Sequence, residues 1–199
     1  MIKLYETDRL IVRPFIEEDI QGNYQQWFHD IDVTRFNSHG LFPYTESQMK
    51  AFLQRLESSS DIVWAVIAKE KGKMLKCPEN TIYNADENLY YIHIGNISLQ
   101  NINWINRSAE FACVFGEKEF WGKGYCTEAA RLLFAHGFEK LGLHRIWTGT
   151  AQTNMGMRGV AIKLGMTNEG VFLDGMFLNG QFVDIYTYAI LEQDWKSTI

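Results

Sequence analysis

Two closely spaced glycines separate a predicted strand from a predicted helix, and this junction constrains the fold more than any other part of the chain. The strand is predicted at 109–115 and the helix at 125–140, where alanine, leucine and phenylalanine follow the glycines directly. Gly142 then stands where a helix C-terminal cap prefers glycine, and another strand is predicted at 144–150. This alternation of strand, helix and strand is typical of an α/β fold.

The loop between this strand and helix has the chemistry of an anion site. Its sequence, EFWGKGYCTEAARLLF at 119–134, places Gly122 and Gly124 on either side of Lys123. The first N–H groups of a helix have no partner within the helix and carry about half a positive charge, so they attract phosphate. The glycines would let the backbone approach such an anion closely. Two better-known phosphate motifs are absent, because there is no G-x-x-x-x-G-K-[ST] and the third glycine of G-x-G-x-x-G would fall on Thr127.

The remaining segments extend this α/β order. Thr45 and Gln48 have the spacing of a helix N-cap and its third residue, and apolar residues follow at helical intervals, so a helix is predicted at 46–57. The apolar run at 62–68 predicts a strand covered on both faces. Further predictions are strands at 8–15, 89–99 and 182–191, a hairpin turn at Asn179 and Gly180, a helix within 16–28, a helix at 154–164, and an exposed insertion or long hairpin at 69–88.

Composition and charge exclude several classes of protein. A chain of 199 residues, 46% hydrophobic and 22% charged, suits one globular domain, predicted here over 1–199. No segment reaches the ~20 apolar residues of a membrane span and the N-terminus has no secretory pattern, so a cytoplasmic location is expected. A net charge of −5 without a run of Lys or Arg argues against nucleic acid as a partner. Three cysteines without C-x-x-C spacing and five scattered histidines predict no metal site.

The order of these elements and the residues within them resemble the GNAT superfamily of acyl-CoA-dependent N-acetyltransferases, in particular the branch related to ribosomal-protein N-terminal acetyltransferases. The resemblance is carried by AEFACVFGEKEFWGKGYCTEAARLLFAHGFEKLGLHRI at 109–146, by Asn154 with KLGMTNEG at 163–170, by NGQFVDIYTYAIL at 179–191 and by TDRLIVRPFIEEDI at 7–20. It covers nearly the whole chain. It implies an α/β fold with a central mixed and twisted sheet of about seven strands flanked by helices, and a splay between the two central strands.

The resemblance also implies acetyl-CoA as the acetyl donor and co-substrate. Its diphosphate would lie on the glycine loop. Its pantetheine arm would lie along the strand at 113–116, whose backbone N–H groups would polarise the thioester carbonyl. The implied cofactor-binding residues are Val114, Phe115, Trp121, Gly122, Lys123, Gly124, Tyr125, Cys126, Thr127, Asn154 and Arg158.

Acetyl transfer to an amine requires a neutral nucleophile, whereas an alkyl amine with a pKa of ~10 is mostly protonated at neutral pH. By the resemblance, Glu110 is predicted as the base, acting directly or through water, and Asn154 as a second catalytic residue that binds the cofactor arm and also caps a helix. A solvated edge carboxylate or a salt bridge to Arg107 is the alternative for Glu110. Asp184 and His93 are predicted at the acceptor pocket. A structural hydrogen bond to the hairpin is the alternative for the first of these, and a core position for the second.

Two positions depart from the pattern of the family. Glu119 stands where relatives often have glutamine or arginine, so its carboxylate would have to point away from a phosphate. Ala161 stands where many relatives have a tyrosine that donates a proton to the leaving thiolate. Tyr186, Tyr188 or a water molecule would have to replace that tyrosine, or the thiolate would leave unassisted.

The leading hypothesis is direct attack of the amine in a ternary complex, and a covalent route through Cys113 or Cys126 is the alternative mechanism. The predicted acceptor is a small amine, for example an amino sugar, because the chain has no acidic run to bind a basic ribosomal protein. A protein N-terminus is the alternative acceptor. A non-catalytic CoA-binding module is the alternative class of protein, suggested by the two departures. The aromatic residues Phe177 and Tyr188 would suit either a homodimer contact or the core.

Overall fold

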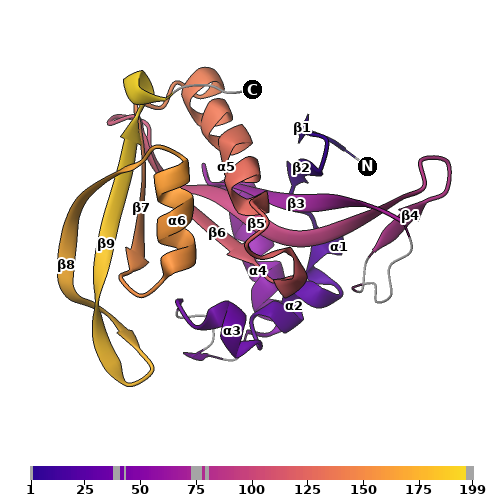
Figure 1. Cartoon of the computed structure of the whole chain (residues 1–199), viewed down its shortest axis with the longest axis horizontal. Helices are drawn as coiled ribbons and strands as arrows, with labels where there is room; N and C mark the ends of the chain where they lie inside the picture. Colours follow the sequence, from indigo (N-terminus) through magenta and orange to yellow (C-terminus); the bar gives the residue numbers. More distant parts are fainter. Residues whose placement is uncertain (1, 38–40, 43, 73–77, 79–80, 196–199) are drawn as a thin grey trace.

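The computed structural model describes residues 2–37, 41–42, 44–72, 78 and 81–195, which form one mixed sheet with helices on both faces (Figure 1). The strands lie in the order β1-β2-β3-β5-β6-β7-β9-β8, with β4 paired to β5. Among the described strands only β6 and β7 run parallel to each other. The strands are β1 (Tyr5–Glu6), β2 (Leu10–Pro14), β3 (Ile62–Lys71), β4 (Ile82–Asn84), β5 (Leu89–Asn103), β6 (Ser108–Phe115), β7 (Arg145–Ala151), β8 (Thr167–Leu178) and β9 (Gln181–Leu191).

The predicted mixed sheet flanked by helices is confirmed, but it has nine strands, more than the sequence predicted. The two additional strands are short, since β1 has two residues and β4 has three. Part of the segment 69–88 continues the sheet, because β3 extends to Lys71 and β4 pairs with the first residues of β5. Within that segment, 73–77 and 79–80 lie outside the described residues.

The helices are α1 (Glu17–Ile20), α2 (Asn23–Trp27), α3 (Ile31–Thr34), α4 (Glu46–Ser58), α5 (Tyr125–Ala135) and α6 (Met155–Lys163). The single helix predicted within 16–28 is two helices, because Gly22, with φ at 79°, interrupts it. Helix α4 begins at the predicted cap, where Gln48 accepts a hydrogen bond from the backbone N–H of Thr45 at 2.8 Å. Helix α5 continues as a π-helical turn, His136–Lys140. No helix in the described part of the chain is long and apolar enough to cross a membrane.

The sheet separates two hydrophobic cores. On β2, Leu10 and Val12 belong to the core under α5 and α6, whereas Ile11 between them belongs to the core under α1, α2 and α4. On β3, Val66 and Ile67 divide in the same way. Successive side chains of a strand point to opposite faces, so each strand contributes to both cores. Figure 1 shows the two groups of helices as separate layers.

The sheet opens at its centre. Strands β6 and β7 pair only over Ser108 to Glu110 and Arg145 to Trp147. Beyond this point β6 remains paired with β5 as far as Phe115, while β7 remains paired with β9. The two central strands therefore separate after Glu110, which confirms the predicted splay. The glycine loop and α5 follow β6 at the open end.

Candidate cofactor and acceptor site

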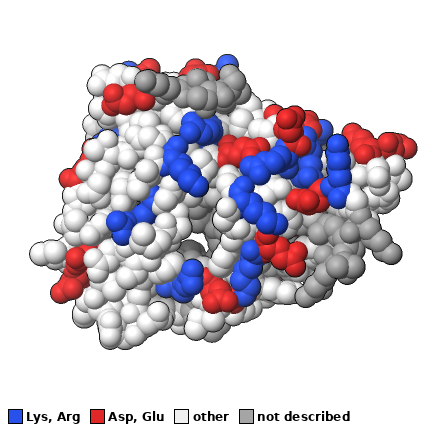
Figure 2. All heavy atoms as spheres, viewed as in Figure 1, with Lys and Arg blue, Asp and Glu red and all other residues white. Residues whose placement is uncertain are grey.

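A cavity of about 770 Å³ lies where β6 and β7 separate. Its walls come from α3, β5, β6, the glycine loop, α5, β7, α6 and one residue of β8, Met176. A volume of this size falls in the range of small-molecule sites. On the face drawn in Figure 2, acidic and basic side chains are interspersed, with neither sign gathered alone.

The glycine loop forms one edge of this cavity. Gly122 and Gly124 have φ of 72° and 86°, a conformation that favours glycine, and Gly124 is the N-cap of α5. A Cβ atom at Gly122 would meet no atom within 4 Å. The positive φ angle, and not crowding by a neighbour, therefore explains why this position is glycine. Both glycines line the cavity. The unpartnered N–H groups at the start of α5 therefore lie beside open space that a ligand can occupy.

Most of the predicted cofactor residues meet in this cavity. They come from three places that are separate in the sequence: the splayed part of β6, the glycine loop with the first turn of α5, and the start of α6. The predicted residues that line the cavity are Val114, Phe115, Trp121, Gly122, Gly124, Tyr125, Cys126, Thr127 and Asn154.

Lys123 and Arg158 are the predicted cofactor residues that do not line the cavity. The Arg158 guanidinium donates to the Tyr188 hydroxyl at 3.2 Å and lies 4.7 Å from the centre of the Tyr186 ring. The Lys123 ammonium lies 5.7 Å from the centre of the Phe120 ring. Both cations are therefore directed at aromatic rings of the protein.

Lys163 supplies a cation on the cavity wall that the sequence analysis missed. Gly156, Gly159 and Lys163 follow one another along α6 at intervals of three and four residues, and all three line the cavity. Such intervals place residues on one face of a helix. This periodicity is the sequence signal that would have predicted Lys163, in place of Arg158, as the cation of α6 on the cavity wall.

Asn154 caps a helix as predicted, and its contact with the cofactor arm stays a prediction. It is the N-cap of α6, where its Oδ1 accepts a hydrogen bond from the backbone N–H of Met157 at 3.1 Å, and it lines the cavity. Thr148 and Thr150 of β7, two buried polar residues, line the adjacent wall and were not predicted. Their spacing of two residues along a strand places them on the same face of the sheet.

Glu110 lies at the point where the central strands separate. It is the last residue of β6 that pairs with β7, opposite Trp147, and it lines the cavity. Its carboxylate accepts a hydrogen bond from the Asn101 side chain at 2.8 Å. The alternative salt bridge to Arg107 does not form, because that guanidinium binds Glu192 at 3.0 Å. The structure thus leaves the Glu110 carboxylate beside the cavity without a cationic partner among the described residues.

The two predicted acceptor residues, His93 and Asp184, do not line the cavity. The His93 ring is buried, accepts or donates a hydrogen bond with Asn96 at 2.8 Å, and packs edge-on against Trp27. Burial lowers the pKa of His93. The Asp184 carboxylate accepts a hydrogen bond from the backbone N–H of Asp174 at 3.0 Å across the β8–β9 pair. His93 therefore occupies a core position, and Asp184 makes a hydrogen bond within the hairpin, which are the alternatives to their predicted roles at the acceptor pocket.

The two departures from the family pattern also have a place in the structure. Glu119 is exposed and does not line the cavity in which the diphosphate is predicted to bind. Ala161 is fully buried in the core. Among the described residues that line the cavity, Tyr125 is the tyrosine. Its hydroxyl is already engaged, because it donates a hydrogen bond to Glu70 at 2.9 Å. Burial, together with this hydrogen bond, raises the pKa of Tyr125 to about 12.

Two thiols face each other in the cavity. The Sγ atoms of Cys113 and Cys126 are 3.4 Å apart, and both residues line the wall. The hydrogen bond to Cys113, together with burial, raises the pKa of Cys126 well above its usual value. Because the thiolate is the reactive nucleophile, a thiol held in its protonated form is poorly suited to the covalent route.

Comparison with known proteins gives consistent matches over most of the chain. Residues 9–167 match the family model described as Acetyltransferase (GNAT) domain. The chain is 37% identical over 175 residues to the probable N-acetyltransferase YjcK of Bacillus subtilis, which covers 88% of this chain and 86% of YjcK. The solved structure of a GNAT-family acetyltransferase from Bacillus anthracis is 26% identical, with a TM-score of 0.71 over 94% of this chain and 98% of that chain. A Vibrio cholerae spermidine N-acetyltransferase, solved with CoA and spermine, is 21% identical, with a TM-score of 0.73 over 94% of this chain and 98% of that chain.

Proposed function

The chain belongs to the GNAT acetyltransferase family and is an acetyl-CoA-dependent N-acetyltransferase, and we propose that it acetylates a small primary amine in the cavity between β6 and β7. In this proposal the amine attacks acetyl-CoA directly in a ternary complex. One observation carries the proposal: the splayed strands, the glycine loop and the Glu110 carboxylate all border the same cavity. Donor and acceptor would therefore meet beside Glu110.

Three features of the cavity support acetyl-CoA binding by these residues. The start of α5 and the glycine loop, residues 121–127, offer N–H groups to the diphosphate. Lys163 adds a positive charge to the cavity wall. Beyond Glu110, the edge of β6 toward β7 has no paired strand in the described part of the chain, so its N–H and C=O groups can pair with the amides of the pantetheine arm. One of these carbonyls, that of Phe115, already accepts a hydrogen bond from the Trp121 indole at 2.8 Å.

In the proposed reaction, Glu110 removes the proton of the amine and solvent protonates the leaving thiolate. Bound acetyl-CoA would supply the thioester carbonyl that the amine attacks. Glu110 accepts the amine proton, directly or through water, as the new C–N bond forms and the C–S bond breaks. Solvent in the cavity protonates the departing thiolate, because Ala161 has no hydroxyl group and the Tyr125 hydroxyl is bound to Glu70.

The charges on the cavity wall favour an acceptor with a single amine. Among the described residues of the wall, Asp32 and Glu110 are acidic, and Arg35 and Lys163 are basic. Asp32 binds Lys118 at 3.0 Å, which leaves Glu110 as the carboxylate for an acceptor. A polyamine would bring more positive charge than this wall neutralises. An amino sugar or another amine with one positive charge matches it better.

A protein N-terminus is the second candidate acceptor, and one feature of the surface favours it. Beside Met176, which lines the cavity, the β8–β9 hairpin exposes Phe172 and Leu173 to 62% and 80%. Exposed apolar patches of this kind often mark contacts with other proteins. A polypeptide acceptor could pack its apolar side chains there while its N-terminus enters the cavity.

Two further proposals accompany this function. The first is a cytoplasmic location, which rests on the apolar segments and the N-terminal pattern of the sequence.

The second is a homodimer built on the β8–β9 hairpin. Phe177 and Phe182 at the end of this hairpin are 52% and 65% exposed, whereas Tyr188, the other aromatic residue considered for this contact, is buried at 4%.

Acetyl transfer to a panel of amines tests the proposed acceptor class. Release of the CoA thiol is measured with acetyl-CoA and, in turn, an amino sugar, spermidine and a short peptide with a free N-terminus. We expect the highest kcat/KM with the amino sugar. A higher value with the peptide would favour the second candidate, and a higher value with spermidine would contradict the charge argument.

A further inference from the structure

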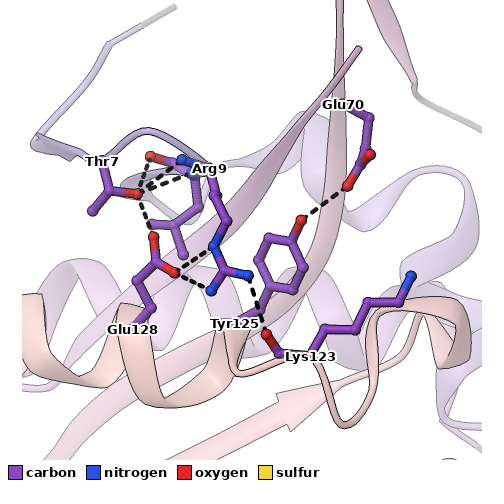
Figure 3. A network of polar contacts seen from close by, with 7 residues as sticks. Thr7, Arg9, Glu70, Lys123, Tyr125 and Glu128 are labelled. Carbon is purple, nitrogen blue, oxygen red and sulfur yellow. Dashed lines mark hydrogen bonds and ion pairs between the residues drawn. The ribbon is translucent and has the colours of Figure 1, made fainter. Parts of the chain in front are cut away.

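Arg9, which is far from the glycine loop in the sequence, contacts that loop in the folded chain (Figure 3). It lies directly before β2, and its Nη1 donates to the backbone carbonyl of Lys123 at 3.1 Å. Its Nε donates to the Glu128 carboxylate at 2.9 Å, and its Nη2 forms an ion pair with the same carboxylate. The guanidinium also lies 4.6 Å from the centre of the Tyr125 ring. One side chain therefore joins the start of β2 to the loop and to the first turn of α5.

The partner of Arg9 is itself held in place. The Thr7 hydroxyl donates to the second oxygen of Glu128 at 2.5 Å and accepts the backbone N–H groups of Arg9 and Leu10 at 3.2 and 3.1 Å. Both carboxylate oxygens of Glu128 are thus occupied. This arrangement fixes the turn that carries Arg9 as well as the carboxylate that Arg9 binds.

Tyr125 connects the same network to the sheet. As the first residue of α5 it lies under the guanidinium of Arg9, and its hydroxyl donates to Glu70 of β3 at 2.9 Å. Tyr125 lines the cavity, whereas Arg9 and Glu128 do not. The polar network shown in Figure 3 therefore reaches the cavity through Tyr125, while its Arg9–Glu128 ion pair lies outside the cavity lining.

The Lys123 carbonyl determines the direction of the next N–H group. In a trans peptide the C=O of one residue and the N–H of the next point in opposite directions, and the described chain has no cis peptide. Arg9 binds the Lys123 carbonyl, so the Gly124 N–H is directed away from Arg9, and Gly124 lines the cavity whereas Arg9 and Lys123 do not. We propose that Arg9 is a positioning residue that presents the Gly124 N–H to the diphosphate of acetyl-CoA, a role that rests on the proposed function of the loop.

Charge gives Arg9 a second effect on the same site. Glu128 lies in the first turn of α5, where an unpaired carboxylate would repel a bound diphosphate. The guanidinium of Arg9 neutralises this carboxylate. Loss of Arg9 would therefore free the loop carbonyl and expose a negative charge beside the diphosphate site.

The Arg9→Met variant tests this role, because methionine keeps the apolar stem but has no donor and no charge. We expect its KM for acetyl-CoA to rise roughly ten- to a hundredfold, with kcat at saturating acetyl-CoA close to that of the unchanged protein. Arg9→Lys should show a smaller rise, since one ammonium keeps the charge but cannot reproduce the fork of the guanidinium. Acetyl-pantetheine, which has no diphosphate, should react at the same rate with Arg9→Met and with the unchanged protein when transfer is followed at high enzyme concentration.

Two control variants separate this inference from the proposed function. Arg145→Met removes a similar fork of hydrogen bonds, to Glu169, at a site that does not line the cavity, and should leave the KM for acetyl-CoA unchanged. Gly124→Val tests the loop itself. A rise in KM with Gly124→Val and none with Arg9→Met would overturn the role of Arg9 while keeping the loop assignment, and no rise with either would overturn both. An equal loss of rate with acetyl-pantetheine in Arg9→Met would show a general structural defect and also overturn the positioning role.

Discussion

At the scale of single residues, Glu110 is the last residue of β6 that pairs with β7, and its carboxylate accepts a hydrogen bond from Asn101 at 2.8 Å. Glu110→Gln keeps the shape of this side chain but removes the base. We expect kcat/KM to fall roughly a hundredfold or more near neutral pH. The fall should become smaller as the pH approaches ~10, where an alkyl amine is already neutral.

The pH profiles of kcat/KM for both proteins, measured with one amine, test this prediction. Glu192→Gln is the matched control, because it changes an exposed carboxylate that pairs with Arg107 outside the cavity. If Glu110→Gln lowers the rate by the same factor at every pH, Glu110 has no part in proton transfer.

The two facing thiols give a second prediction for single residues. In a Cys77→Ser background we expect the oxidant diamide to link Cys113 and Cys126, whose Sγ atoms are 3.4 Å apart. Two S–H bonds break, one S–S bond forms, and the N=N bond of diamide takes up both hydrogens. Because the pKa of Cys126 is raised, this reaction should speed up as the pH rises and more thiolate forms.

Bound CoA should slow this oxidation, since both thiols line the cavity that CoA is proposed to fill. Mass spectrometry of the linked peptides measures the rate with and without CoA, and Cys126→Ala serves as the control that cannot form the link. A rate that does not respond to CoA would place the nucleotide elsewhere.

At the scale of elements, Gly116 couples β6 to the helix layer on the other side of the sheet. A Cβ atom at Gly116 would lie 1.9 Å from ring carbons of Trp27 in α2, so Gly116→Ala should lower the free energy of unfolding by about 1–3 kcal/mol or more. Gly159→Ala is the matched control in α6. No atom lies within 4 Å of a Cβ atom there, and alanine suits a helix interior better, so this variant should gain about 0.5–1 kcal/mol. Denaturant titration measures both, and changes of the same sign would contradict the packing argument.

The elements that could be predicted from sequence are those with a local signal. The capping residues Thr45 and Gln48 determine where α4 begins, and the glycine loop determines where α5 begins. The break at Gly22, where φ is 79°, has a local signal in the glycine itself, which the prediction of one helix within 16–28 overlooked. The π-helical turn His136–Lys140 has no such signal in the sequence. The length of β5 was underestimated for the same reason, since its last residues pair with β6 through a bulge.

At the scale of the whole molecule, the splay and most of the cofactor-binding residues that line the cavity could be predicted through the resemblance to the family, because its motif spans a consecutive strand, loop and helix. The role of Arg9 could not, since its partner Lys123 is 114 residues away and only the folded sheet brings them together. For His93 the sequence left an acceptor role and a core position open. Its place on β5 suggested the acceptor pocket, but the side chain points into the core under α1, α2 and α4, where Trp27 covers it.

The edge of the sheet at β8 bears on how copies of the molecule associate. Strand β8 lies at the edge of the sheet, and its hairpin with β9 exposes Leu173 to 80% and Phe177 to 52%. A strand whose outer edge has no neighbouring strand in the described sheet, beside exposed apolar side chains, favours association between copies of the chain. We therefore expect a homodimer through this hairpin. Light scattering over a range of concentrations should give the mass of a dimer, and Leu173→Lys with Phe177→Lys should give the mass of a monomer. Ile105→Lys, at a site 94% exposed between β5 and β6, is the control and should leave the dimer intact. A monomer at every concentration would contradict the homodimer and leave the hairpin available for a polypeptide acceptor.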